Sequence, residues 1–81
     1  PPILFGGELV GRLDPKADRK NRKLIIRNLV IEKEITNVDS FTNELARKID
    51  DLAAFNGCES IYIERCNPKK IGAALSRLLT N

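Results

Sequence analysis

The positively charged side chains of this chain gather in one short stretch, RLDPKADRKNRK, at residues 12–23. This stretch holds six Lys or Arg residues, two acids and one Pro between two apolar runs. The six basic residues are Arg12, Lys16, Arg19, Lys20, Arg22 and Lys23. Ammonium and guanidinium groups form charge-assisted hydrogen bonds with phosphates and carboxylates. The chemistry that this stretch predicts is the binding of an anion, and the alternative is a solvated turn that is charged for solubility.

The two acids of the stretch, Asp14 and Asp18, would repel a polyanion, so they suit another role. An aspartate carboxylate accepts hydrogen bonds from backbone amides just ahead of it and stabilises a turn. Pro15 presets φ for a turn at the same place. We therefore expect Asp14 and Asp18 to brace the turn, while the basic side chains meet the anion.

Other chemistry is poorly supported by the residue types. The chain has no His, so its serines lack a triad base and its thiols lack their usual activator. With no His and no CxxC, no zinc site is expected either. If a strand separates Cys58 from Cys66, their Cα atoms are about 25 Å apart, too far for a disulfide. We expect two free thiols in a cytoplasmic protein, with no catalytic residue, no metal and no cofactor.

The charge of the whole chain is unevenly distributed. A formal net charge of +3 divides into +4 over residues 1–27, −4 over residues 28–66 and +3 over residues 67–81. A domain polarised in this way presents one positive end, which attracts polyanions. The longest apolar runs fall far short of about 18 residues, so no membrane partner is expected.

Two strands joined by the basic stretch are expected to form a hairpin with a protruding tip. Residues 3–5 form a short strand before a Gly-Gly turn, and residues 8–13 form the next strand, which Asp14-Pro15 ends. Residues 23–32 form a long strand rich in β-branched side chains. Alternation places Leu24, Ile26, Asn28 and Val30 on one face of this strand, and Ile25, Arg27, Leu29 and Ile31 on the other. Because both faces are mostly apolar, we expect a neighbour beyond these 81 residues to cover one of them.

Two helices and a further strand complete the pattern. Residues 38–56 show an apolar stripe at helical spacing, with Asp39 or Ser40 as the expected N-cap and Gly57 as the C-terminal cap. Residues 60–64 are expected to form a strand, and Asn67-Pro68 to open a second helix. The stripe of the first helix is Phe41, Leu45, Ile49 and Leu52, and the inner face of the second is Ile71, Ala74, Leu75 and Leu78.

These elements predict a single α+β domain over residues 1–81, with the order β-β-β-α-β-α. We expect a small antiparallel sheet, a protruding basic hairpin and both helices packed on one face. The start at Pro1-Pro2 without Met suggests a C-terminal piece of a longer protein.

The N-terminal residues also resemble a known family. They are similar to the pattern P-x-L-[YF]-G-x-x-L-V-[GA]-R-x-D-x-K-x-D-R of the YcaQ/AlkZ-like winged-helix DNA glycosylases, which repair interstrand crosslinks and alkylated bases. The matching positions are Pro2, Leu4, Phe5, Gly6, Leu9, Val10, Gly11, Arg12, Asp14, Lys16, Asp18 and Arg19. The resemblance is specific over residues 2–19 and weaker after residue 31; Gly7 departs from it, because an Asp is common there.

The resemblance implies DNA as a partner and base excision as the activity of the parent protein. The family's catalytic Gln-hydrophobic-Gln or Gln-hydrophobic-Asp motif lies upstream and has no counterpart here, so no catalytic residue is carried over. We therefore expect an accessory domain that binds the DNA phosphate backbone through the six basic residues and packs on upstream winged-helix domains of the same chain. The alternatives are a structural packing module that never meets nucleic acid, in which the aspartates and arginines brace one another, and an independent enzyme.

Overall fold

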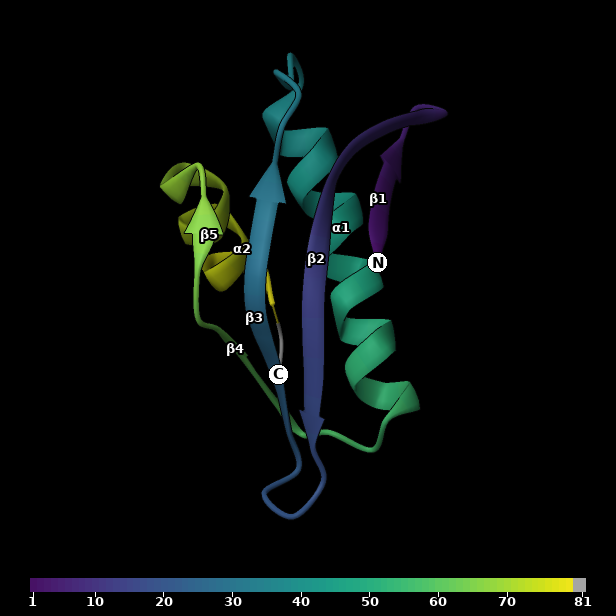
Figure 1. The fold of residues 1–81 in the computed structure, drawn as a ribbon, viewed down its shortest axis with the longest axis vertical. Helices are drawn as coiled ribbons and strands as arrows, with labels where there is room; N and C mark the ends of the chain where they lie inside the picture. The colour runs from purple at the N-terminus through teal and green to yellow at the C-terminus, as the bar shows by residue number, and fades with distance from the viewer. Residues whose placement is uncertain (80–81) are drawn as a thin grey trace.

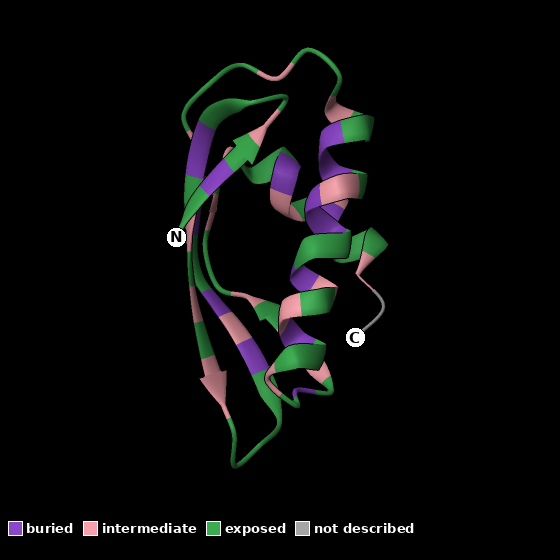
Figure 2. Ribbon diagram, turned by 90° about the vertical axis from the view of Figure 1, so that its right-hand side faces the viewer, coloured by how far each residue is buried: buried purple, intermediate pink, exposed green. Residues whose placement is uncertain are grey.

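The structure is a computed structural model that describes residues 1–79. Four strands form a sheet in the order β1-β2-β3-β4, and a short fifth strand, β5, also pairs with β3. The elements in chain order are β1 (Pro2–Phe5), β2 (Glu8–Asp18), β3 (Lys23–Ile31), α1 (Val38–Phe55), β4 (Ser60–Ile63), β5 (Cys66–Asn67) and α2 (Lys69–Leu78) (Figure 1). Both helices lie on one face of the sheet, as expected, and among the described residues no helix lies on the other, which we call the open face (Figure 2).

The α+β class and the expected order of the main elements are confirmed, but the sheet is mixed rather than wholly antiparallel. β1, β2 and β3 pair antiparallel, whereas β4 and β5 run parallel to β3. The reason is the long helix α1 between β3 and β4. A crossover helix returns the chain to the end of the sheet where the previous strand began, so the next strand must run in the same direction.

The hydrophobic core lies between the sheet and the two helices. The expected stripe of α1 supplies Phe41, Leu45 and Ile49, all buried. Phe41 packs edge-to-face on Phe5 of β1, with ring centroids 5.1 Å apart, and so holds the first strand on the helix. The other buried apolar residues of the core are Ile3, Val10, Leu24, Ile26, Leu29, Ala46, Ala53, Cys58, Ile71 and Leu75.

The ends of the helices differ slightly from expectation. The N-cap of α1 is Asn37, whose side chain accepts a hydrogen bond from the Ser40 amide at 3.0 Å, rather than Asp39 or Ser40. Gly57 has a φ of +69° just beyond the helix, as expected for a C-terminal cap. Helix α2 begins at Lys69 with Pro68 as its N-cap and no side-chain cap, so Asn67 does not fill that role.

The faces of β3 are not those that simple alternation predicts. Asp14 pairs with Asn28 and Pro15 pairs with Ile26, so the pairing skips Arg27 and forms a β-bulge. The extra residue brings Leu29 onto the helix side, where it is fully buried. The expectation that Leu29 and Ile31 share the face of Ile25 is therefore wrong. The apolar side chains that β3 leaves on the open face are Ile25 and Val30, so this face is less apolar than the sequence suggested.

Candidate nucleic-acid interface

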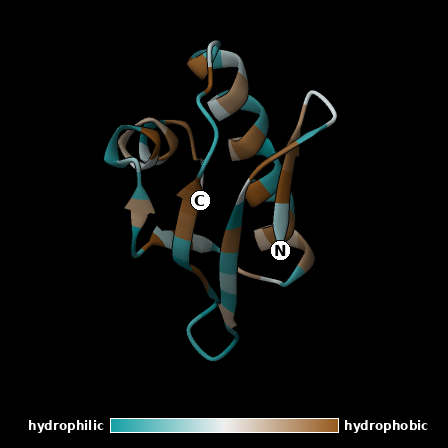
Figure 3. Ribbon diagram, turned by 45° about the horizontal axis from the view of Figure 1, so that its top comes forward, coloured by the Kyte–Doolittle hydropathy of each residue, from teal (hydrophilic) through white to brown (hydrophobic). Residues whose placement is uncertain are grey.

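Residues 16–23 of the basic stretch form the end of the β2–β3 hairpin, which extends beyond both helices (Figures 1 and 2). Arg12 is not part of this end, because it is paired with Val30 near the other end of β3. Asp14-Pro15 does not end the second strand, because the bulge on β3 accommodates it and β2 continues to Asp18. The turn is therefore only four residues long, from Arg19 to Arg22, between the paired Asp18 and Lys23. The tip is strongly hydrophilic (Figure 3) and all four turn residues are exposed.

Asp18 holds this turn. Its carboxylate accepts hydrogen bonds from the Asn21 backbone amide at 3.2 Å and from the Asn21 side-chain amide at 2.8 Å. The pKa of Asp18 is lowered below its ordinary value. The largest cause is the hydrogen bond from the Asn21 side chain, followed by the bond from the Asn21 backbone amide and the charges of Lys23 and Lys16. Lys23 is paired with Asp18 across the hairpin, and Lys16 lies two residues before Asp18 on the same face of β2.

Asp14 does not have the expected role. It lies within β2, opposite the bulge, and its exposed side chain makes no hydrogen bond or salt bridge to any described residue. Asp14 was expected in the turn because Pro15 follows it. Because β2 continues through Asp14-Pro15, Asp14 lies four residues before Asp18, the last residue of the strand.

Two of the six basic residues have carboxylate partners. Arg12 pairs with Glu32 and Arg22 pairs with Glu59, each at 3.0 Å between exposed side chains. Such surface pairs contribute little to stability and open easily. The Arg22 carbonyl also accepts hydrogen bonds from the backbone amides of Glu59 and Ser60, which ties the tip to the start of β4.

The other four basic residues, Lys16, Arg19, Lys20 and Lys23, make no salt bridge to any residue in the 1–79 range. Lys16 is paired with Ile25 and Lys23 with Asp18, in rows that face away from the helices. The tip and the adjoining part of the open face therefore present one group of accessible positive charges, which we call the basic tip.

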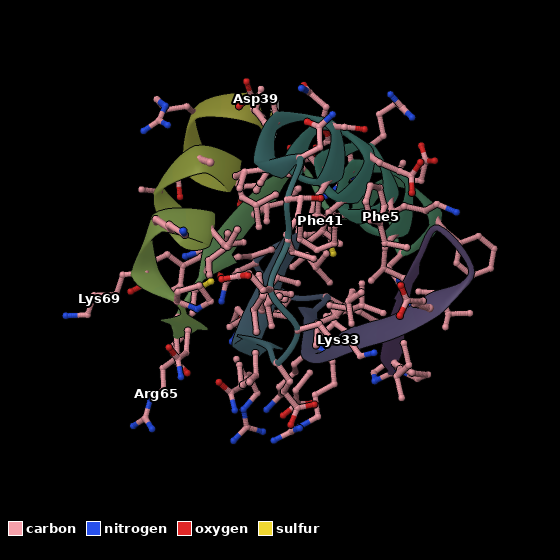
Figure 4. All side chains as sticks on the ribbon, turned by 90° about the horizontal axis from the view of Figure 1, so that it is seen from above. Phe5, Lys33, Asp39, Phe41, Arg65 and Lys69 are labelled. Atoms are coloured by element: carbon pink, nitrogen blue, oxygen red, sulfur yellow. The ribbon has the colours of Figure 1, made fainter. Side chains whose placement is uncertain are left out.

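The structure adds basic residues that sequence reasoning missed. Arg27, the extra residue of the bulge, is exposed and lies next to the row of Lys16. Arg65 projects from the side of the sheet opposite the helices (Figure 4). The sequence could have indicated a role for Arg27, because it is a charged residue inside a mainly apolar strand. Which face of the sheet its side chain lies on follows only from the pairing register.

The two thiols are free, as expected. Cys58 is buried, and Cys66 is partly buried with its thiol donating to the Pro68 carbonyl at 3.4 Å. Burial raises the pKa of the Cys66 thiol, which disfavours the nucleophilic thiolate. Cys66 lies in a shallow hollow of about 510 Å³ beside Arg65, Lys69 and Gly72.

Within residues 1–79, no group of three His, Cys, Asp or Glu residues is placed to hold a metal ion. No helix in this range is long and apolar enough to cross a membrane. Comparison with family models, curated proteins and solved structures finds no match to this chain.

Proposed function

We propose that this domain binds the phosphate backbone of DNA through its basic tip, as an accessory domain of a cytoplasmic DNA glycosylase that acts on crosslinked or alkylated DNA. The observation that carries the proposal is the position of the basic tip. Four basic side chains that form no salt bridge with residues 1–79 stand towards the end of a narrow β-hairpin, where a phosphate backbone can reach them. The glycosylase context comes from the resemblance of residues 2–19 alone.

The physical role follows from the kind of contact. Lysine and arginine side chains on a turn meet phosphates and position a protein on nucleic acid, but they carry no sequence information. Base excision needs access to the glycosidic bond in a distorted duplex. A basic hairpin would hold the backbone beside the lesion, while the catalytic residues come from the upstream winged-helix part of the chain.

The second candidate is a packing module without nucleic-acid contact. It is supported by Leu4 and Leu9, which are paired across β1 and β2 and are 66% and 57% exposed. An exposed apolar pair of this kind suits an interface with another domain. The two candidates are compatible if the β1–β2 hairpin packs on the upstream domains while the basic tip binds DNA.

The test is a titration of the 81-residue protein with duplex DNA at several salt concentrations. With about four phosphate contacts, affinity should be micromolar or weaker and should fall about 100-fold between 50 and 200 mM salt. Replacing Lys16, Lys20 and Lys23 by Glu should abolish binding and leave the circular dichroism spectrum unchanged, because these side chains are exposed.

A control variant separates the basic tip from the overall charge of the protein. Arg47, Lys48 and Lys70 are exposed residues of the two helices, and their replacement by Glu changes the net charge by the same amount. This variant should keep most of the binding, since its changes lie on the helical side. Equal losses in the two triple variants, or no binding by the wild type at 50 mM salt, would refute the proposal.

A further inference from the structure

Tyr62 lies on β4, an edge strand that pairs with β3, and about half of its surface is exposed. Ile25 of β3 is paired with Lys16 of β2 on one side and with Tyr62 on the other, so the three residues form one row across the sheet. The neighbours of Ile25 along β3, Leu24 and Ile26, are buried under the helices. Because side chains alternate along a strand, the row Lys16–Ile25–Tyr62 points away from the helices.

The exposure of the Tyr62 ring contrasts with the partial burial of the neighbouring side chains in β4. Ile61 and Ile63 on either side of Tyr62 pack against the core, whereas Tyr62 is 55% exposed. The half-buried Ile25 lies beside it and gives the ring an apolar neighbour on the sheet. An exposed aromatic ring beside an aliphatic side chain offers a surface on which a planar group can stack.

The charged residues in and around this row are three basic side chains, those of Lys16, Lys23 and Arg27, and three acids. Lys23 lies in the adjacent row towards the tip, paired with Asp18 and Ser60, and Arg27 lies on the other side in the bulge. The acids of these rows are Asp14, Asp18 and Glu64. The carboxylate of Asp18 already accepts two hydrogen bonds from Asn21. An aromatic ring flanked by basic side chains matches the combination that binds single-stranded nucleic acid.

We propose that the open face binds an unpaired segment of DNA, with one base stacked on Tyr62 and the adjoining phosphates bound by Lys16, Lys23 and Arg27. This inference rests on the proposed function and specifies the form of DNA that the domain recognises. In a duplex the faces of the bases are stacked on one another, so Tyr62 can accept a base only where the helix is opened. The domain would therefore prefer DNA with unpaired bases to intact duplex.

A protein partner fits this face less well. The centre of a protein interface is depleted of charged residues. Here the apolar side chain beside Tyr62 is that of Ile25, and Lys16, Arg27 and Glu64 are close by. Val30, the other apolar residue of β3 on this face, lies near the far end of the strand, paired with Asn67. The mixture of one aromatic ring with basic side chains favours the nucleic acid.

Tyr62 is the chain's single Tyr, and the chain has no Trp, so its fluorescence reports directly on this position. Titration with an oligothymidylate of about 12 nucleotides, a length that one small domain can occupy, should quench the tyrosine emission. A duplex of the same length should bind through the basic tip with less quenching and lower affinity. Binding of each DNA is followed in parallel by the anisotropy of a labelled oligonucleotide.

Two variants test the stacking contact. Tyr62→Ala should weaken binding of the single strand by roughly 5- to 150-fold, the range expected for one stacked base, whereas Tyr62→Phe should retain it. Phe55→Ala is the matched control, because Phe55 is an aromatic residue at the end of α1 that is 89% exposed. This control should bind like the wild type.

The outcomes separate this inference from the proposed function. If duplex and single strand bind equally and Tyr62→Ala changes neither, the stacking site is refuted and the basic tip remains. If the wild type binds neither DNA at low salt, both proposals fail. Quenching by the single strand, together with a loss that is specific to Tyr62→Ala, supports the stacking site.

Discussion

The two aspartates of the basic stretch show how position decides the role of identical side chains. Asp18 is the last residue of β2, so its carboxylate reaches the Asn21 amides across the turn. Asp14 lies four residues earlier in the same strand, where neighbouring amides are used by the sheet and its carboxylate faces solvent. Only Asp18 has a contact that explains why an acid lies among so many basic residues.

At the residue scale we predict that Asp18→Asn lowers the melting temperature at pH 6 but not at pH 2 to 3. The folded protein holds the pKa of Asp18 below its ordinary value, so the carboxylate stabilises the fold above that value. This stabilisation is lost as pH falls below about 4 and through the folded pKa, because the protonated acid no longer accepts both hydrogen bonds. Thermal unfolding followed by circular dichroism at the two pH values measures the effect.

Asp14→Asn is the control for this prediction, since Asp14 has no hydrogen-bond partner among residues 1–79. Its melting temperature should follow that of the wild type at both pH values. If Asp18→Asn lowers the melting temperature by the same amount at pH 6 and at pH 2, the role of Asp18 does not depend on its carboxylate charge.

At the scale of elements, the close contact of β2 with β3 positions the basic tip. Gly11 of β2 is paired with Ile31 of β3 and is buried. A Cβ atom at this position would meet the Val30 carbonyl oxygen and would lie 3.0 Å from the Ile31 Cα atom. Backbone atoms cannot move aside as a flexible side chain can, so the two strands approach closely here only because position 11 lacks a side chain.

We predict that Gly11→Ala destabilises the protein by about 1 to 3 kcal/mol, the usual cost of forcing an extra carbon into a packed site. This loss of stability should lower the urea concentration at the unfolding midpoint. In NMR spectra, the amide signals of β2 and β3 should broaden more than those of α2. Leu9→Ala, on the same strand but with an exposed side chain, should stay within about 0.5 kcal/mol of the wild type. A Gly11→Ala protein as stable as the wild type would show that the strands can separate without cost.

At the scale of the molecule, one core joins the N-terminal strand to the helices. Phe41 is 1% exposed and contacts Phe5, so α1 fixes β1 and, through the β1–β2 pairing, the base of the long hairpin. A domain of this size has a total stability of only about 4 to 12 kcal/mol. The orientation of the basic tip therefore depends on a few large core side chains.

We predict that Phe41→Ala costs about 3 to 5 kcal/mol, a large part of the total stability. If this variant is too unstable to measure, Phe41→Leu and Phe5→Leu with their double variant should show a coupling of about 0.5 to 1.5 kcal/mol for the aromatic pair. Phe55→Ala makes the same chemical change at an exposed position and should fall within about 0.5 kcal/mol of the wild type. Urea unfolding measures all of them, and equal effects at Phe41 and Phe55 would contradict the assigned core.

Local patterns in the sequence determined the type of most elements. The helical spacing of the stripe at Phe41, Leu45 and Ile49, the glycine at position 57 and the β-branched run of β3 each depend on conformational preferences of neighbouring residues. The same local chemistry indicated a turn among the basic residues and the bracing role of Asp18. The α+β class and two helices on one face follow from these patterns alone.

The tertiary structure decided which residues meet, because pairing depends on atoms that are far apart in the chain. The bulge at Arg27 reversed the faces of the end of β3, and the position of α1 made β4 parallel to β3. Strand pairing also brought Tyr62 into the row of Lys16, although 45 residues separate them in the chain. The register of a sheet is set by the packing of its buried face, so the composition of the open face is a consequence of the core.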